Sequence, residues 1–245
     1  MSARVTAATA QRVLWQLRRD PRTVALVIGV PSVLLVLMRF IFERRLGVFQ
    51  SVGAPLCGMF PFTLMFVVTS VTMLRERTTG TLERLMTLPL AKFDLLLGYA
   101  VAFGLLAAAQ AAIVCLLGFV ALGLHAPHGA WLVGVLAVGN AVLGMSLGLF
   151  ISAFARTEFQ AVQFMPAIVF PQMLLSGLFA PRDSMAGLLR AISDVMPLTY
   201  AYDALHRATT PLALGSGLAV DIAVVVGATI VALGLGALTL RRRTA

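Results

Sequence analysis

Side chains that could perform covalent or redox chemistry are few in this sequence and lie far apart. Cys57 and Cys115 both lie in apolar segments, and they form neither a CxxC pair nor a spacing typical of metal ligands. His125 and His128 share a short loop with no other ligand near them in the sequence. No GxxxxGKS/T or HExxH motif occurs. We therefore expect no catalytic residue, no metal site and no cofactor bound directly by this chain, which is predicted not to be an enzyme.

Amide and acidic side chains are the remaining candidates for a polar site. The amides within or next to apolar segments are Gln110, Asn140, Gln160, Gln163 and Gln172. They could line a path across a membrane or hydrogen-bond helices to one another, and the second role is favoured. Asp94 and Asp221 lie near the ends of apolar segments, and Glu158 lies in a turn. Because an ion-coupled transporter usually carries ionisable residues deep within its membrane segments, this pattern argues against one.

The elements that must carry these side chains are almost entirely apolar. The chain of 245 residues is 60% hydrophobic and 12% charged, whereas a soluble domain is about 45–50% apolar and about 25% charged. Its net charge of +9 would suggest nucleic acid in a soluble protein, but no base-reading motif is present and we expect no nucleic-acid partner. The composition predicts an all-α polytopic membrane protein.

Six apolar stretches are long enough to cross a bilayer, because about 20 helical residues span a hydrocarbon core of about 30 Å. The predicted transmembrane helices are residues 22–42, 51–74, 93–124, 130–154, 159–180 and 212–240. Asp20 and Pro21 are typical of an N-cap and of the first residue of a helix. Pro55 and Pro61 predict a kink in the second span or a late start. In the fourth span, the spacing of Gly144 and Gly148 predicts close helix packing.

Two further segments are amphipathic but too polar to span. Residues 1–20 combine several arginines with Val13, Leu14, Trp15 and Leu17, which predicts an N-terminal interfacial helix along the membrane surface. A plain basic tail is the alternative. Residues 181–211 mix charged and apolar side chains and predict two short external amphipathic helices, broken near Met196 and Pro197.

The distribution of basic residues predicts the orientation of the chain. Six spans place both termini on one side, and most of the 19 basic residues fall on that side. These are Arg4, Arg12, Arg18, Arg19, Arg22, Arg75, Arg77, Arg84, Lys92, Arg156, Arg241, Arg242 and Arg243. The other side carries Arg39, Arg44, Arg45, Arg182, Arg190 and Arg207. Because basic loops stay in the cytoplasm, both termini are predicted to be cytoplasmic.

The stretch Arg75–Leu90, RERTTGTLERLMTLPL, is the longest strongly polar interruption in the first half of the chain. Thr79, Gly80 and Thr81 can end one helix and cap the next, since threonine accepts bonds from early helix N–H groups and glycine tolerates the turn. The apolar residues Leu82, Leu85, Met86 and Leu88 then predict a short amphipathic helix, which Pro89 ends. We expect a cytoplasmic helix that another protein could bind.

The segment Met73–Tyr99 resembles the signature of ABC-2-type transporter permeases, and it is especially similar to permeases typified by daunorubicin export. The family pattern RE-R-x-x-G-T-L-E-x-L, followed by Pro-Leu, is matched by Arg75, Glu76, Arg77, Gly80, Thr81, Leu82, Glu83, Leu85, Pro89 and Leu90. RRDPRTVAL at Arg18–Leu26 resembles the family's entry to its first span. MPLTYAYDALH at Met196–His206 resembles the segment before its last span. The resemblance covers the whole chain.

This resemblance implies a fold and a set of partners. The expected fold is one transmembrane domain, residues 1–245, with an N-terminal interfacial helix, six spans, and external helices between the fifth and sixth spans. Residues 75–92, between the second and third spans, would form the coupling helix that sits in a separate ABC ATP-binding subunit. The resemblance implies two such subunits, which hold ATP and Mg, and a second copy of the permease, as a homodimer, or a homologous permease. The expected location is the bacterial plasma membrane.

The coupling segment is where the resemblance places function. The residues expected to contact the ATPase are Arg75, Glu76, Arg77, Gly80, Thr81, Leu82, Glu83, Arg84, Leu85 and Met86. Leu82, Leu85 and Met86 would form an apolar knob, while Glu76, Glu83 and Arg84 would fix its orientation. The predicted function is ATP-driven export of a hydrophobic or amphipathic, antibiotic-like substrate, as in multidrug resistance. The alternatives are a lipid or polysaccharide exporter permease, an ion-coupled secondary transporter, and a non-transport membrane scaffold.

Overall fold

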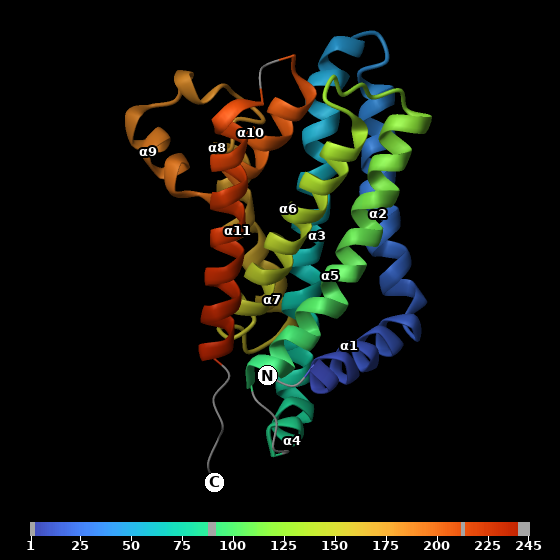
Figure 1. Ribbon diagram of the computed structural model, residues 1–245, viewed down its shortest axis with the longest axis vertical. Helices are drawn as coiled ribbons and strands as arrows, with labels where there is room; N and C mark the ends of the chain where they lie inside the picture. The colour runs from blue at the N-terminus through green and yellow to red at the C-terminus, as the bar shows by residue number, and fades with distance from the viewer. Residues whose placement is uncertain (1–2, 88–91, 212–213, 240–245) are drawn as a thin grey trace.

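The computed structural model describes residues 3–87, 92–211 and 214–239. Throughout these ranges the secondary structure is helical and no strand is present, which confirms the predicted all-α class. Five helical runs are long and apolar enough to cross a membrane, and they extend along the long axis of the molecule (Figure 1). They are α2 (Pro21–Ile41), α3 (Leu46–Thr78), α5 (Lys92–Leu116) continued by the π-helical η1 (Leu117–Ala121), α6 (Ala130–Ile151) and α11 (Gly215–Leu238). The chain is an integral membrane protein.

Helices α3 and α6 form the centre of the bundle. In the most apolar 18-residue stretches of α3 and α6, 61% and 67% of the residues are buried, against 17% in each of α2 and α11. The backbones approach so closely that a side chain on Gly144 or Gly148 would overlap the carbonyl groups of Phe62 and Phe66. The Thr69 hydroxyl also donates across the contact to the Met145 carbonyl at 3.1 Å. The close packing predicted from these two glycines is therefore confirmed.

Helix α1 (Ala3–Arg18) crosses one end of the bundle instead of running along it (Figure 1). Its buried residues are Thr9, Ala10, Val13 and Leu17. Gly98 of α5 lets α1 come close, because a side chain there would meet Thr9. Trp15 is half exposed, and the Arg18 guanidinium lies over its ring. An amphipathic helix lying across the bundle end is the arrangement that the sequence predicts for residues 1–20.

The predicted bounds of the second and third spans differ from the structure. Helix α3 begins at Leu46, so the expected late start is wrong: Pro55 and Pro61 are accommodated inside the helix, where the bundle buries them. The third helical run ends at Ala121 and not at Leu124. Gly123, with φ +71°, turns the chain, and the Leu124 N–H bonds back to the Gly118 carbonyl.

The predicted fifth span, residues 159–180, is not one regular helix. It consists of α7 (Glu158–Phe164), the π-helical η2 (Met165–Val169) and α8 (Phe170–Leu175). Pro166 and Pro171 explain the irregularity, since neither can donate the backbone bond that continues an α-helix. The helical run ends at Leu175, short of the predicted Ala180.

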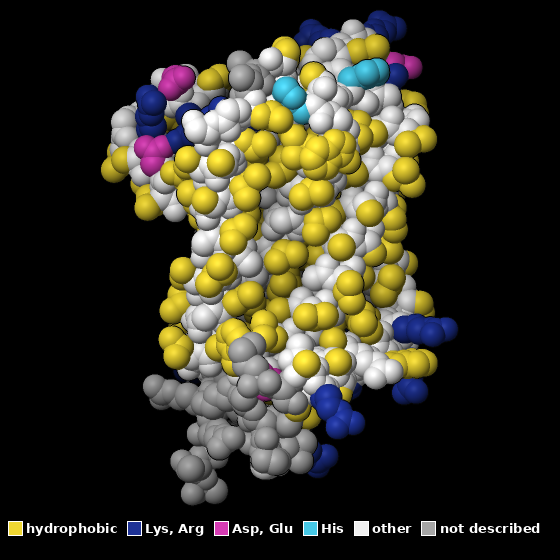
Figure 2. All heavy atoms as spheres, viewed as in Figure 1, with side chains coloured by type: hydrophobic (Ala, Val, Ile, Leu, Met, Phe, Trp, Pro, Cys, Tyr) yellow, Lys and Arg dark blue, Asp and Glu magenta, His cyan; other side chains and the backbone are white. Residues whose placement is uncertain are grey.

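Three short helices lie at the end of the bundle opposite α1. They are η3 (Arg182–Ser184), α9 (Gly187–Val195) and α10 (Pro197–Thr209), with Met196 between α9 and α10. Helix α9 projects sideways from the bundle, whereas α10 lies against α11 (Figure 1). Figure 2 shows hydrophobic side chains over the middle of the molecule and lysine and arginine side chains toward its two ends. This division is the one a membrane protein needs, because charge is costly in hydrocarbon.

Candidate functional site

The predicted coupling segment begins where α3 ends. Thr79 caps α3, its N–H and its hydroxyl both bonding the Arg75 carbonyl, and its hydroxyl lies 3.1 Å from that of Thr81. Gly80 then adopts a left-handed φ of +72°, which an L side chain disfavours. Helix α4 (Thr81–Thr87) starts immediately afterwards, and the Arg84 N–H bonds the Gly80 carbonyl at 3.0 Å. The structure thus places α4 beyond the end of the bundle, after a turn held by these hydrogen bonds (Figure 1).

Helix α4 has one side against the protein and one side exposed. Leu82 is only 3% exposed; it belongs to the core cluster with Leu17, Met73 and Leu95, against which Leu85 packs. Arg84 and Thr87 are exposed. The expected role of Leu82 as part of a projecting knob does not match this placement, because its side chain anchors α4 to its own bundle. The side chains of Glu83 and Met86, and the structure of residues 88–91 with the predicted stop at Pro89, lie outside the described residues.

Arg75 joins the end of α3 to the start of α7. Its Nε donates to Glu158 Oε1 at 2.6 Å and its Nη2 to Glu158 Oε2 at 2.8 Å. Both side chains are more than half exposed, so we expect this bidentate pair to fix geometry more than to stabilise the fold.

Glu76 points in a different direction, into the angle between α1 and α5. Its side chain is only 8% exposed. Arg12 Nη1 lies 3.5 Å from both carboxylate oxygens, and the Gln16 amide donates to Oε1 at 3.3 Å. Arg12 also donates to the hydroxyl of the buried Tyr99 of α5. Glu76 therefore holds α1 onto the bundle, a contact that the sequence did not predict.

Arg77 points in a third direction, toward the end of α11. Its Nη2 donates to the Thr239 hydroxyl at 3.3 Å. Successive helical residues are rotated by about 100°, so three consecutive side chains reach three different neighbours. We call Arg75, Glu76 and Arg77 the α3 hub. It connects the turn before α4 to α7, to α1 and α5, and to α11.

A hollow of about 430 Å3 lies beside the hub, between α1, the start of α2 and α3. Val67, Val68 and Val71 supply apolar walls, and Gln16 and Asp20 supply polar groups. Asp20 accepts bonds from the Thr23 N–H at 3.1 Å and from its hydroxyl at 2.6 Å, as predicted for an N-cap. These hydrogen bonds lower the pKa of the Asp20 carboxyl.

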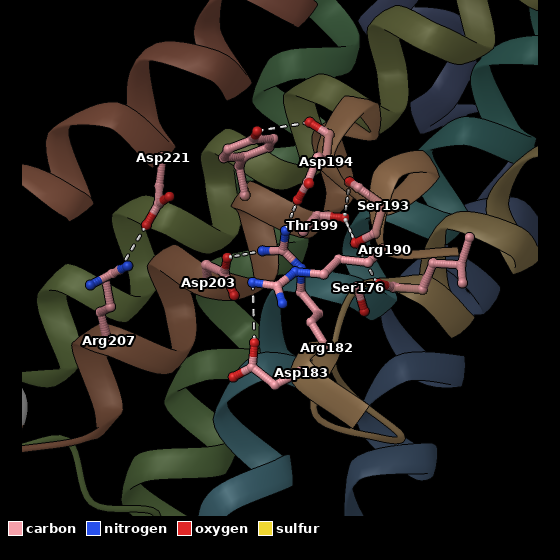
Figure 3. A network of polar contacts seen from close by, with 12 residues as sticks. Ser176, Arg182, Asp183, Arg190, Ser193, Asp194, Thr199, Asp203, Arg207 and Asp221 are labelled. Carbon is pink, nitrogen blue, oxygen red and sulfur yellow. Dashed lines mark hydrogen bonds and ion pairs between the residues drawn. The ribbon is translucent and has the colours of Figure 1, made fainter. Parts of the chain in front are cut away.

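The opposite end of the molecule carries a second polar network (Figure 3). Arg182 binds Asp194 of α9 and, through Nη1, Asp203 of α10 at 2.9 Å. Arg190 pairs with Asp183 at 3.3 Å, and Arg207 with Asp221 of α11 at 3.0 Å. Burial raises the pKa of the Asp203 carboxyl even though Arg182 lies beside it. Arg182 thus joins α9 and α10 to the chain that follows α8.

Comparison with known proteins identifies the family of this chain. A profile of the ABC-2 type transporter family matches residues 4–208. The chain belongs to the ABC-2 type transporter family. Among similar proteins, the probable multidrug ABC transporter permease YbhR of Escherichia coli is 31% identical over 145 residues, which are 57% of this chain and 38% of YbhR. The related permease YbhS is 27% identical over 180 residues, 72% of this chain and 47% of YbhS.

A eukaryotic relative matches as well. ABC transporter G family member 20 of Dictyostelium discoideum is 28% identical over 139 residues, covering 57% of this chain and 19% of the relative. The chain therefore spans less than half the length of each of these relatives over the matched regions. ABC-2 permeases are membrane components of transporters, and they work with ABC ATP-binding subunits, generally as dimers.

For this ABC-2 permease, the sequence singled out the segment that contains the α3 hub and α4. It did not predict which residues of the same chain contact the hub. The missed residues are Arg12, Gln16, Tyr99, Glu158 and Thr239. They lie far from residues 75–77 in the chain, so no local spacing links them to the hub. The one available signal was Glu158, an acidic residue in a turn on the same predicted face of the membrane as Arg75.

Proposed function

We propose that this chain is the permease subunit of an ATP-driven ABC exporter that moves a hydrophobic or amphipathic, drug-like substrate out across a bacterial plasma membrane. In this proposal two ABC ATP-binding subunits hold ATP and Mg, and a second copy of the permease, or a homologous one, completes the transporter. The multidrug permeases among the similar proteins support the substrate class. The apolar spans also suit a lipophilic cargo.

The proposed topology has six crossings and both termini in the cytoplasm. The irregular run from α7 to α8 is the fifth crossing. One of its ends is tied through Glu158 to Arg75 beside α4, and the other leads toward α9 at the opposite end of the bundle (Figure 1). The excess of basic residues on the side of α4 supports a cytoplasmic position for that side.

The observation that carries the proposal is the attachment of α4. A short helix with exposed Arg84 and Thr87 lies beyond the bundle, while its Leu82 is buried in the permease core. A partner that moves α4 would therefore move Leu82 and, through the Gly80 turn, the α3 hub. From the hub the displacement reaches α7, α1 and α11 together. Glu83, Arg84, Leu85 and Met86 are the proposed contacts with the ATPase, and ATP-driven closure of the two ATPases supplies the movement.

The alternatives differ in partner and energy source. A lipid or polysaccharide exporter would share the ATPase and differ only in cargo. An ion-coupled transporter would lose transport when an ionophore is added in the presence of ATP, whereas a scaffold would require no ATP-binding subunit.

Charge reversal on the exposed side of α4 tests the proposal. Arg84→Glu places a negative charge where the ATPase should bind, and we expect about tenfold weaker copurification of the ATP-binding subunit from gentle detergent. The matched control is Arg44→Glu, an exposed arginine at the opposite end, which should copurify the subunit as the unmodified chain does. Full copurification with Arg84→Glu, or failure of the unmodified chain to retain any ATP-binding subunit, would contradict the proposed coupling site.

A further inference from the structure

A second hollow, separate from the hub, lies on the outer surface where the turn after α6 meets α7. Its volume is about 370 Å3. We call it the Arg156 groove; its lining residues are Phe154, Arg156, Gln160, Gln163, Phe164 and Ala167. None of these residues is acidic. The groove thus combines one cation, two amides and an apolar part.

The charge of Arg156 is not neutralised by the acid nearest to it in the sequence. Both oxygens of Glu158 are occupied by Arg75, at 2.6 and 2.8 Å. Among the described residues, no ion pair involves Arg156, and its side chain is exposed. The groove therefore has a positive end, and an anion is the ligand that complements it.

The amides add hydrogen-bond donors beside this cation. Gln160 Oε1 accepts the Arg156 backbone N–H at 2.8 Å, which fixes the Gln160 side chain next to Arg156 and leaves its Nε2 group able to donate to a ligand. Gln163 follows three residues later, and residues three apart lie on the same face of a helix. An anionic group at this end would meet one guanidinium and two amide groups.

The other end of the groove is apolar. Phe154 is 58% exposed, and Phe164 and Ala167 continue along α7 and η2, one turn beyond Gln160 and Gln163. These helices run from the α4 end of the bundle toward its middle (Figure 1). A ligand that fills the groove must therefore be charged at the level of the membrane surface and apolar at the level of the hydrocarbon.

We propose that the Arg156 groove binds a phospholipid with an anionic headgroup from the bilayer leaflet on the α4 side. The phosphate lies on Arg156, Gln160 and Gln163, and an acyl chain follows Phe164 and Ala167. A lipid requires the polar end of the groove to lie at the level of the membrane surface and its apolar end at the level of the hydrocarbon. A protein partner would not require this match. A zwitterionic lipid would fit less well, because its own cationic group would lie near the Arg156 guanidinium. The inference goes beyond export and does not depend on it.

Fluorescence quenching by brominated lipids tests this proposal in reconstituted bilayers. The reporter is Phe154→Trp in a background of Trp15→Phe and Trp131→Phe, both exposed positions. We expect brominated phosphatidylglycerol to quench the reporter with about fivefold higher relative affinity than brominated phosphatidylcholine, the gain typical of one basic residue at an anionic surface. A reporter at Val135→Trp, exposed on α6, should show no preference.

Two matched variants locate the preference. Arg156→Gln should abolish it, whereas Arg22→Gln, an exposed arginine at the start of α2, should retain it. If both lipids quench equally, or if the preference survives Arg156→Gln, the groove holds only bulk lipid and the proposal is wrong. Quenching by neither lipid would show that protein covers the groove.

Inorganic phosphate, added at constant ionic strength, distinguishes a lipid from a small anion. The phosphatidylglycerol preference should persist, and its loss would identify a site for free phosphate instead. Native mass spectrometry provides a readout without the reporter. The otherwise unmodified chain should retain one more phosphatidylglycerol molecule than its Arg156→Gln variant, and equal retention would overturn the proposal.

Discussion

At the scale of single residues, the link between α3 and α4 depends on one backbone conformation. Gly80 has φ +72°, and a side chain built there would touch nothing within 4 Å. Any effect of substitution must therefore come from backbone strain and not from a clash. This makes Gly80 a clean probe of the turn on which α4 is held.

We predict that Gly80→Ala strains this turn by about 1 kcal/mol. Helix α4 should lose its fixed orientation, which lowers copurification of the ATP-binding subunit and substrate-stimulated ATP hydrolysis. Gly104→Ala is the control, because Gly104 lies inside α5 with an ordinary φ and equally open space. If the two variants behave alike in both assays, the Gly80 turn has no part in coupling.

Asp20 is the second residue whose contribution can be measured separately, through the pH dependence of stability. Its hydrogen bonds from Thr23 lower the pKa of the carboxyl in the folded protein below its ordinary value of about 3.9. A lowered folded pKa means that Asp20 stabilises the protein fully above about pH 4 and progressively less as pH falls through the folded pKa.

We predict that Asp20→Asn, which keeps a capping oxygen without the charge, removes this part of the acid dependence. Thermal unfolding in detergent between about pH 5 and pH 3 should show the unmodified chain losing stability more steeply than the variant. Parallel curves would contradict the assignment. Asp20→Ala should instead lower the midpoint at every pH, because the Thr23 N–H loses its acceptor.

At the scale of elements, a proline explains one of the few buried polar contacts between spans. Pro31 of α2 has no N–H, so the Val27 carbonyl one turn earlier lacks its usual helical donor. Gln110 of α5 supplies the missing bond, with Nε2 at 2.8 Å from the Val27 oxygen. An unsatisfied carbonyl within hydrocarbon would be costly. The amide side chain that could have lined a path thus joins two helices.

We predict that Gln110→Leu lowers the free energy of unfolding by about 1–2 kcal/mol. In the presence of Pro31→Ala, which restores a backbone N–H one turn after Val27, the same substitution should cost clearly less. Thermal unfolding of the four chains in one detergent measures this difference as a double-mutant cycle. Additive effects of the two substitutions would show that Gln110 does not compensate for Pro31.

Elements also show where local patterns are informative. The Thr-Gly-Thr sequence predicts the break between α3 and α4, and Met196-Pro197 predicts the break between α9 and α10, because both depend on neighbouring residues. Local patterns do not predict the start of α3 at Leu46 or the irregular η2. A proline inside a bundle can be accommodated within a continuous helix, as in α3, or can interrupt the regular helix, as in η2.

At the scale of the whole molecule, the arrangement separates two charged ends by an apolar middle (Figure 2). The α3 hub and α4 lie at one end, and the Arg182 network lies at the other. The proposed fifth crossing is the only one of the six that lacks a long regular helix among the described residues. Its topology is therefore the part of the fold that most needs a direct measurement.

We predict that single cysteines at the two ends react from opposite sides of the membrane. Thr87→Cys on α4 and Arg156→Cys before α7 should react with a membrane-impermeant maleimide only after permeabilisation, whereas Asp183→Cys, 87% exposed, should react in intact cells. Cys57 and Cys115 are buried and should give little background labelling. Labelling of Arg156→Cys and Asp183→Cys from the same side would exclude a crossing between them.

The sequence by itself determined the membrane class, five long apolar helices among its six predicted spans, the amphipathic helix α1 and the turn that presents α4. These features follow from composition and from residues close together in the chain, so local rules suffice. Only the tertiary structure decided that Leu82 is buried and that Arg75, Glu76 and Arg77 bind three different elements. It also decided that Gln110 supplies the hydrogen bond to Val27 that Pro31 cannot donate. The physical reason is that all the spans are similarly apolar. Which faces meet depends on close packing and on a few polar partners that are far apart in sequence.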